Sequence, residues 1–143
     1  MPEVINSLMD ELDGIGWKYQ PPQVYPDGNT VLRSGVNGKN AQYTITMVFD
    51  EKGHTVCLRV FDLIPTPDEK RFQLLELINT LNRDYRWARF FLSQDSRLQV
   101  QVDHLTDGDR CAQEIVELIM RLIRIIDDVY PRFMRIIWGG EGE

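Results

Sequence analysis

The sequence predicts an α+β domain built on an antiparallel sheet, with the order helix, three strands, helix, two strands, helix. Several segments alternate polar and apolar residues, as half-buried strands do, and short turns rich in Gly, Asn and Asp connect them. Strands joined by such tight turns must pair antiparallel. Helical spacing of apolar residues recurs at both ends and in the middle of the chain. A length of 143 residues fits one domain, 1–143.

The first half of the chain contains one predicted helix and three predicted strands. Residues 3–13 have apolar side chains at helical spacing, and the proline-containing segment 17–28 predicts an irregular or edge segment. Strands are expected at 30–36, 41–50 and 54–63. Asn37-Gly38 predicts a tight hairpin in which both central residues accept positive φ. Because both faces of 54–63 are largely apolar, we expect a central strand or one covered on both sides.

A second helix is predicted from the start signal Thr66-Pro67-Asp68-Glu69, in which Thr66 caps the helix. It extends to about residue 82 and is expected to bury one side, consisting of Phe72, Leu75, Ile78 and Leu81. Two strands follow, at 87–92 and 97–104, and we place Trp87 in the core.

The last helix, 109–138, has more apolar surface than one neighbour covers. Its apolar residues fill an arc of roughly 220°, where about 100° suffices to dock a surface helix. We therefore expect cover from its own sheet and from a second protein surface. The predicted dimer or partner interface consists of Leu118, Ile125, Val129, Phe133, Ile136, Ile137 and Trp138. Pro131 predicts a kink near Asp127, and Asp128 is expected to form a surface ion ladder with Arg124 and Arg132.

Composition narrows the function classes. The formal net charge of −6 argues against non-specific binding to nucleic acid and to anionic membranes. The N-terminus lacks the pattern of a signal peptide and no apolar run is long enough to span a bilayer, so we expect a cytoplasmic protein. Cys57 and Cys111 are expected as reduced thiols, with a disulfide as the alternative.

Motifs that carry chemistry are weak. Asp103, Asp107, Gly108 and Glu114 approach the calcium-loop spacing, but Leu105 occupies a ligand position and a strand precedes the loop, which favours helix capping. His54 and His104 lack partners at metal-ligand spacing. The basic and aromatic stretch 83–91 offers single-stranded nucleic acid as a weaker alternative. We predict no catalytic residues, no metal and no cofactor.

A family resemblance rests mainly on the second half of the chain. Leu77-Ile78-Asn79-Thr80-Leu81-Asn82, Ala88-Arg89-Phe90 and Asp127-Asp128-Val129-Tyr130-Pro131 before Trp138-Gly139 resemble the YbjN family of small bacterial proteins, as do Gly35–Gly38 and Val56–Leu63. The resemblance implies a fold like that of type III secretion chaperones, which form homodimers and hold extended partner segments. It also implies a role in sensory-transduction regulation and brings no catalytic residues. From the residues themselves, we expect Asn82 to adopt the left-handed conformation and Asn79 to bond local backbone.

The leading hypothesis is a non-enzymatic, homodimeric, protein-binding domain with a chaperone-like or regulatory role. Its partners would be a second copy and another protein or extended peptide, with no nucleic acid or membrane. The alternative is a small-ligand or enzymatic domain with a pocket between sheet and helices, near Trp17, Tyr19, His54 or Trp87.

Overall fold

The computed structural model describes residues 2–139, so that Met1 and residues 140–143 of the predicted domain lie outside it. The helical elements are α1 (Glu3–Gly14), a single 3₁₀ turn η1 (Asp68–Lys70), α2 (Arg71–Asp84) and α3 (Cys111–Trp138). The strands are β1 (Gln23–Val24), β2 (Thr30–Asn37), β3 (Gln42–Phe49), β4 (Thr55–Val60), β5 (Arg89–Leu92) and β6 (Leu98–Leu105). The predicted order of helices and strands is confirmed, with β1 added as a short edge strand.

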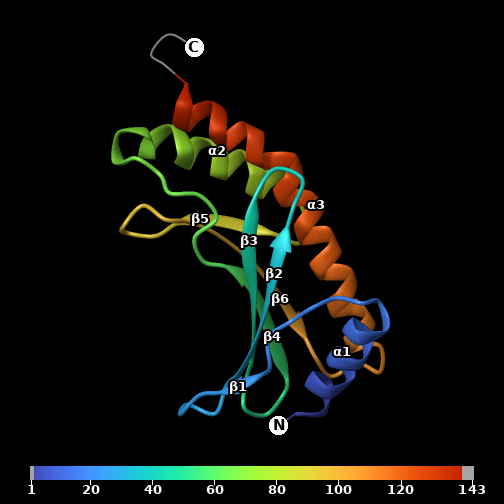
Figure 1. Cartoon of the computed structure of the whole chain (residues 1–143). Helices are drawn as coiled ribbons and strands as arrows, with labels where there is room; N and C mark the ends of the chain where they lie inside the picture. Colours follow the sequence, from blue (N-terminus) through green and yellow to red (C-terminus); the bar gives the residue numbers. More distant parts are fainter. Residues whose placement is uncertain (1, 140–143) are drawn as a thin grey trace.

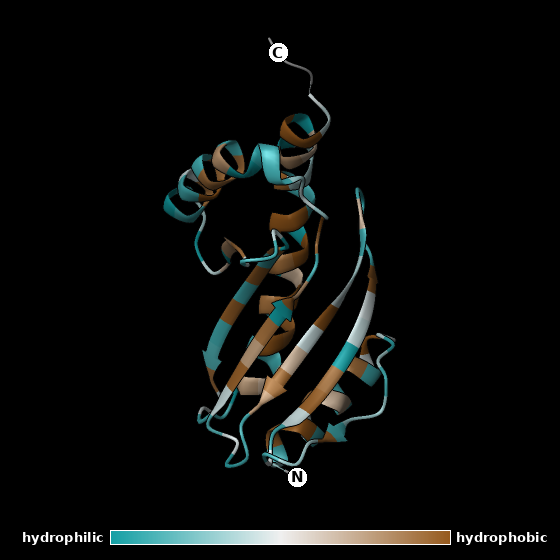
Figure 2. Ribbon diagram, turned by 90° about the vertical axis from the view of Figure 1, so that its left-hand side faces the viewer, coloured by the Kyte–Doolittle hydropathy of each residue, from teal (hydrophilic) through white to brown (hydrophobic). Residues whose placement is uncertain are grey.

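The sheet is antiparallel throughout, with the strand order β1-β2-β3-β4-β6-β5. Helices α1 and α3 cover one of its faces, and none of the helices within residues 2–139 lies over the other face (Figures 1 and 2). Alternation places Ile45, Met47 and Phe49 of β3 on the covered face, where each has no exposed surface. Helix α2 lies against β5 and the C-terminal part of α3 (Figure 1).

The turn between β2 and β3 differs from the predicted one. Asn37 pairs with Gln42, so the loop consists of residues 38–41, and neither Asn37 nor Gly38 has a positive φ. The glycine is needed for space instead. A Cβ at Gly38 would lie 2.9 Å from both the Ala41 carbonyl oxygen and the Asp127 carboxylate, closer than a Cβ normally approaches. The hairpin was predicted correctly, but the reason for its glycine was not.

Strand β4 is central, as predicted, because β3 and β6 flank it. Only its inner face is fully covered: Val56, Leu58 and Val60 are at most 2 % exposed. The outer face carries Arg59, and Phe61, which directly follows the strand, is 45 % exposed, with the Arg59 guanidinium 4.7 Å from the centre of its ring. Cover on both sides is therefore excluded for this strand.

Helix α2 buries a different face from the predicted one. Its buried residues are Leu74, Leu77, Ile78 and Leu81, whereas Phe72 is 73 % and Leu75 42 % exposed. The predicted and the observed sets of apolar residues both fit helical spacing. The observed set is buried because that side of α2 packs against β5 and α3. The Thr66 hydroxyl also does not cap a helix, because it donates to the Ser96 carbonyl of the β5–β6 turn.

Helix α3 receives its second cover from within the chain. In addition to the sheet, α1 packs against it, and α2 packs beside its C-terminal part (Figure 1). Part of the apolar arc is therefore covered within the chain, and cover of the remaining exposed part by a second protein stays a prediction. The helix continues through Pro131, which has no N–H to donate to the Asp127 carbonyl. The side-chain amide of Asn40 donates to that carbonyl instead, at 2.7 Å.

Candidate functional site: the α2–α3 groove

A surface groove follows the line where α2 and α3 meet, and we call it the α2–α3 groove. The two helices run in opposite directions, because Lys70 before α2 donates to the Gly139 carbonyl after α3 at 3.1 Å, and Tyr85 after α2 donates to Asp128 in α3. The groove contains two hollows. A basic end is lined by Lys70, Gln73, Leu77, Arg132, Arg135, Ile136 and Gly139, and an aromatic end by Asp84, Tyr85, Arg86, Trp87, Arg121, Arg124, Ile125 and Asp128.

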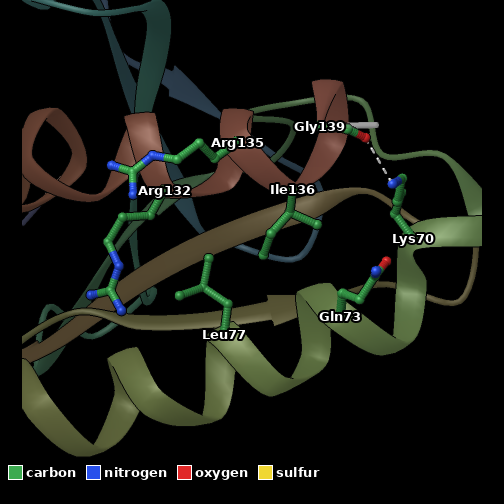
Figure 3. A pocket seen from close by; sticks show the side chains of 7 residues that line it. All are labelled: Lys70, Gln73, Leu77, Arg132, Arg135, Ile136 and Gly139. Carbon is green, nitrogen blue, oxygen red and sulfur yellow. Dashed lines mark hydrogen bonds between the residues drawn. The ribbon is translucent and has the colours of Figure 1, made fainter. Parts of the chain in front are cut away.

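The basic end is a hollow of about 370 Å³ with an apolar floor between cations. Leu77 from α2 and Ile136 from α3 point toward each other across it (Figure 3). Lys70 lies at one end of the hollow, and Arg132 and Arg135 lie at the other (Figure 3). Within residues 2–139, no acidic residue lines this end of the groove. Such a hollow is suited to an anionic group attached to an apolar one.

Whether the Arg132 guanidinium is free to bind a ligand depends on which group the Asp128 carboxylate contacts. Asp128 stands four residues before Arg132, which predicts an ion pair on the helix surface. The ion pairs within residues 2–139 do not include one between Asp128 and Arg124 or Arg132, so the predicted ion ladder is wrong. The Asp128 carboxylate accepts from the Tyr85 hydroxyl instead. This bond, followed by burial, raises the pKa of Tyr85, so the hydroxyl stays a donor at neutral pH.

The aromatic end is built around Trp87, which was predicted to lie in the core. The indole is 54 % exposed, and its neighbour Ala88 occupies the buried position at 2 %. Trp87 has φ of +79° and is the central residue of a three-residue turn that the Ala88 amide closes onto the Arg86 carbonyl at 2.9 Å. A turn of this hand is rare and strained for a bulky side chain. The fold thus holds an exposed tryptophan in an unfavourable backbone conformation.

Helix α3 supports this indole from one side. The Arg121 guanidinium lies 5.5 Å from the centre of the Trp87 ring, within the range of a cation–π interaction. Glu117, one turn earlier, accepts a hydrogen bond from Arg121 at 2.7 Å and so fixes the arginine. The hollow beside the ring has a volume of about 500 Å³. Aromatic and arginine side chains of this kind are the ones most used as binding anchors.

The predicted interface residues of α3 fall into different environments. Leu118, Val129 and Phe133 are buried in the core of the chain itself, Val129 and Phe133 without exposed surface. Ile125 lines the aromatic end of the groove and Ile136 the basic end. Ile137 is partly buried against the core, and Trp138 is 77 % exposed at the end of the helix. Four of the seven therefore keep surface that a partner could reach. The α2 side of the groove was not predicted from the sequence, because its residues lie some fifty positions earlier in the chain.

The residues that the sequence analysis considered as calcium or metal ligands, and its asparagines and cysteines, lie outside the groove or far from one another. Asp103 pairs with Arg89 at 2.8 Å, while His54 contacts Asp107 at 3.0 Å and His104 contacts Glu114 at 3.4 Å. Within residues 2–139 no group of three such side chains is placed to hold a metal ion. Asn79 is exposed, and Asn82 stays helical rather than left-handed. Both cysteines are free thiols.

The space between sheet and helices is filled by apolar side chains. Leu58 from the sheet and Leu122 and Phe133 from α3 have no exposed surface there. Of the residues named for a pocket in this space, Trp17 packs on the core and donates to Ser34 at 2.5 Å, whereas Trp87 belongs to the surface groove. These positions do not assemble a common internal pocket.

Fold and groove together define the class: a small α+β domain with one antiparallel sheet, helices on one face and a cationic surface groove. The chain belongs to the YbjN family, whose model, described as "Putative bacterial sensory transduction regulator", matches residues 5–135. The crystal structure of YbjN from E. coli, described as "a putative transcription regulator", is similar with a TM-score of 0.61. The two share 13 % sequence identity, over 90 % of this chain and 92 % of that one. None of the curated proteins matches the sequence. None of the helices within residues 2–139 has both the length and the hydrophobicity to cross a bilayer.

Proposed function

We propose that this chain is a non-enzymatic, homodimeric domain that binds another protein in a chaperone-like or regulatory role, and that the α2–α3 groove receives the partner. The family description as a regulator of sensory transduction supports the regulatory part. The observation that carries the proposal is Trp87, an exposed indole on a strained turn beside a hollow.

Trp87 has the features of an interface anchor. Tryptophan, tyrosine and arginine dominate the residues whose truncation costs most in protein interfaces, and all three occur together here as Trp87, Tyr85 and Arg121. A fold keeps a strained, exposed aromatic residue only where the surrounding structure imposes it, and such strain clusters at functional sites. Because Arg121 holds the ring from one side, little side-chain freedom is lost on binding.

The test combines photo-crosslinking with one substitution. A photoreactive phenylalanine placed at position 87 in native cells should crosslink to a distinct protein, whereas the same group at the exposed Phe72 should not. Trp87→Gly should abolish capture of that protein. Glycine also fits the positive φ, so this variant should unfold no earlier than the wild type. Equal capture by Trp87→Gly and wild type, or no heterologous crosslink from position 87, would refute the proposal.

The homodimer is supported by the end of α3. Trp138 is 77 % exposed, and Ile137 beside it is only partly buried by its own chain. An exposed tryptophan with a neighbouring aliphatic residue is the type of surface that two-fold partners bury together. We infer that association between copies uses this helix tip and leaves the groove accessible.

A further inference from the structure

The basic end of the α2–α3 groove concentrates positive charge in an acidic protein. Lys70, Arg132 and Arg135 line it, and none of the acidic residues among residues 2–139 lines it with them, although the whole chain carries a net charge of −6. We propose that this end binds an acidic peptide segment of a partner protein. The inference rests on the proposed protein-binding function and names the chemistry of the segment that is bound.

The arginines of this hollow differ from those that are paired with a carboxylate elsewhere in the chain. Arg89, Arg97 and Arg121 each donate to a carboxylate at 2.8 Å or less. For Arg132 and Arg135, the hydrogen bonds and ion pairs within residues 2–139 include no acceptor for either guanidinium. The Lys70 ammonium uses one of its three N–H groups on Gly139 and keeps two. Donors for carboxylates are thus already placed in the hollow.

The floor of the hollow distinguishes a peptide from other anions. Leu77 and Ile136 would contact an apolar side chain, which inorganic anions do not have (Figure 3). Among the described residues 2–139, no aromatic ring on which a nucleic-acid base could stack lines this end of the groove. From Arg132 to Gly139 the helix rises about 10 Å, which equals about three residues of extended peptide. A short segment with acidic residues on either side of an apolar one fits this distance.

A second copy of the chain is a poor occupant for the same hollow. In a two-fold interface centred on this hollow, the cations of one copy would lie opposite those of the other. Like charges placed opposite each other disfavour such a contact. Charge complementarity therefore favours an acidic partner here.

Fluorescence anisotropy with a labelled peptide of alternating Glu and Leu, added to the full chain, tests the proposal. The peptide should bind saturably and more weakly as salt rises. Arg132→Gln and Arg135→Gln should each weaken binding about tenfold, the loss expected for a charge-assisted hydrogen bond. Arg110→Gln, an equal charge removal at the other end of α3, is the matched control and should bind as the wild type does.

Three results would overturn the proposal: no saturable binding, equal binding of a peptide with Gln in place of Glu, or equal weakening by Arg110→Gln. Competition by inorganic phosphate as strong as that of the unlabelled peptide would identify a simple anion site and also overturn it. The readout is independent of Trp87. Loss of peptide binding with retained crosslinking from position 87 would refute the acidic segment and leave the proposed function standing.

Discussion

Asn82 illustrates how one side chain can close the edge of a sheet. Its amide oxygen accepts from the Phe90 N–H at 2.8 Å and its amide nitrogen donates to the Phe90 carbonyl at 3.0 Å. Strand β5 is an edge strand, so both Phe90 groups would otherwise be open to another chain. The asparagine thus takes the place of a neighbouring strand and ties α2 to β5.

Replacing Asn82 should loosen this connection. Asn82→Ala removes both hydrogen bonds and should lower the free energy of unfolding by about 1–2 kcal/mol, measured by urea denaturation. Asn82→Asp keeps the acceptor and should lose less. The exposed Asn79 stands one turn earlier on the same helix, so Asn79→Ala is the matched control, with a change within about 0.5 kcal/mol. Equal losses at both positions would argue against the clamp.

The Cys57 thiol should be protected from alkylation in the folded protein. Burial, followed by the effect of the nearby Asp103 carboxylate, raises its pKa from 9.0 to about 12, so the reactive thiolate is scarce at neutral pH. Iodoacetamide should therefore modify Cys57 far more slowly in the native protein than in urea. Equal rates in the two states would contradict this prediction.

The same pKa difference links Cys57 to stability at high pH. Above pH 9.0 the thiol ionises in the unfolded chain but stays neutral in the fold. The contribution of this thiol to stability is therefore present below pH 9 and is lost as the pH rises toward 12. Cys57→Ser should show a smaller loss of stability over this range.

At the scale of elements, the β2–β3 hairpin is fixed to the middle of α3. The Asp127 carboxylate accepts from the backbone amides of Lys39 and Asn40 at 2.9 and 3.3 Å. The Asn40 side chain donates to the Asp127 carbonyl, which has no helical donor because residue 131 is proline. Proline in the helix therefore serves a tertiary contact: it leaves a carbonyl open for the hairpin, and Gly38 allows the close approach.

This interpretation predicts energetic coupling between Asn40 and Pro131. Asn40→Ala should destabilise the wild type by about 1 kcal/mol, because the carbonyl loses its donor. In a Pro131→Ala background the helix can supply an N–H to the same carbonyl, so Asn40→Ala should cost about half as much or less. A double-mutant cycle by urea denaturation measures the difference. Independent, additive effects would rule out the shared acceptor.

At the scale of the whole molecule, the proposal to be tested is the association of two copies through the end of α3. Sedimentation at micromolar concentration should give about twice the 16.7 kDa mass of the chain, and Trp138→Ser should shift the protein toward monomer. Phe61→Ser, at an exposed aromatic on the open face of the sheet, should remain dimeric. Removing residues 132–143 is a poorer test, since it deletes the buried Phe133. A wild type that sediments as a monomer would contradict the proposed homodimer.

Much of the fold was determined by local patterns. Alternation along β3 and the turn signal at Asn37-Gly38 located strands, and helical spacing located α1 and α3, because these signals depend on neighbours a few residues apart. The motif residues Asn82 and Pro131 were also visible as unusual, although their roles were not. Asn82 bonds Phe90, which lies 8 positions away in another element, and the Asp127 carbonyl that Pro131 leaves open accepts from Asn40, 87 positions away. Local patterns do not reveal such partners.

The sequence by itself determined an antiparallel α+β domain with one overly apolar helix, because strand and helix periods are properties of the chain alone. Only the tertiary structure decided which apolar stripes become core. It turned Phe72 and Trp87 outward, buried Val129 and Phe133, and supplied α1 and α2 as the missing cover of α3. It also brought Lys70 beside Arg132 and Arg135, since two antiparallel helices unite residues some sixty positions apart. Periodicity limits which faces can be apolar, and packing selects which of them is buried.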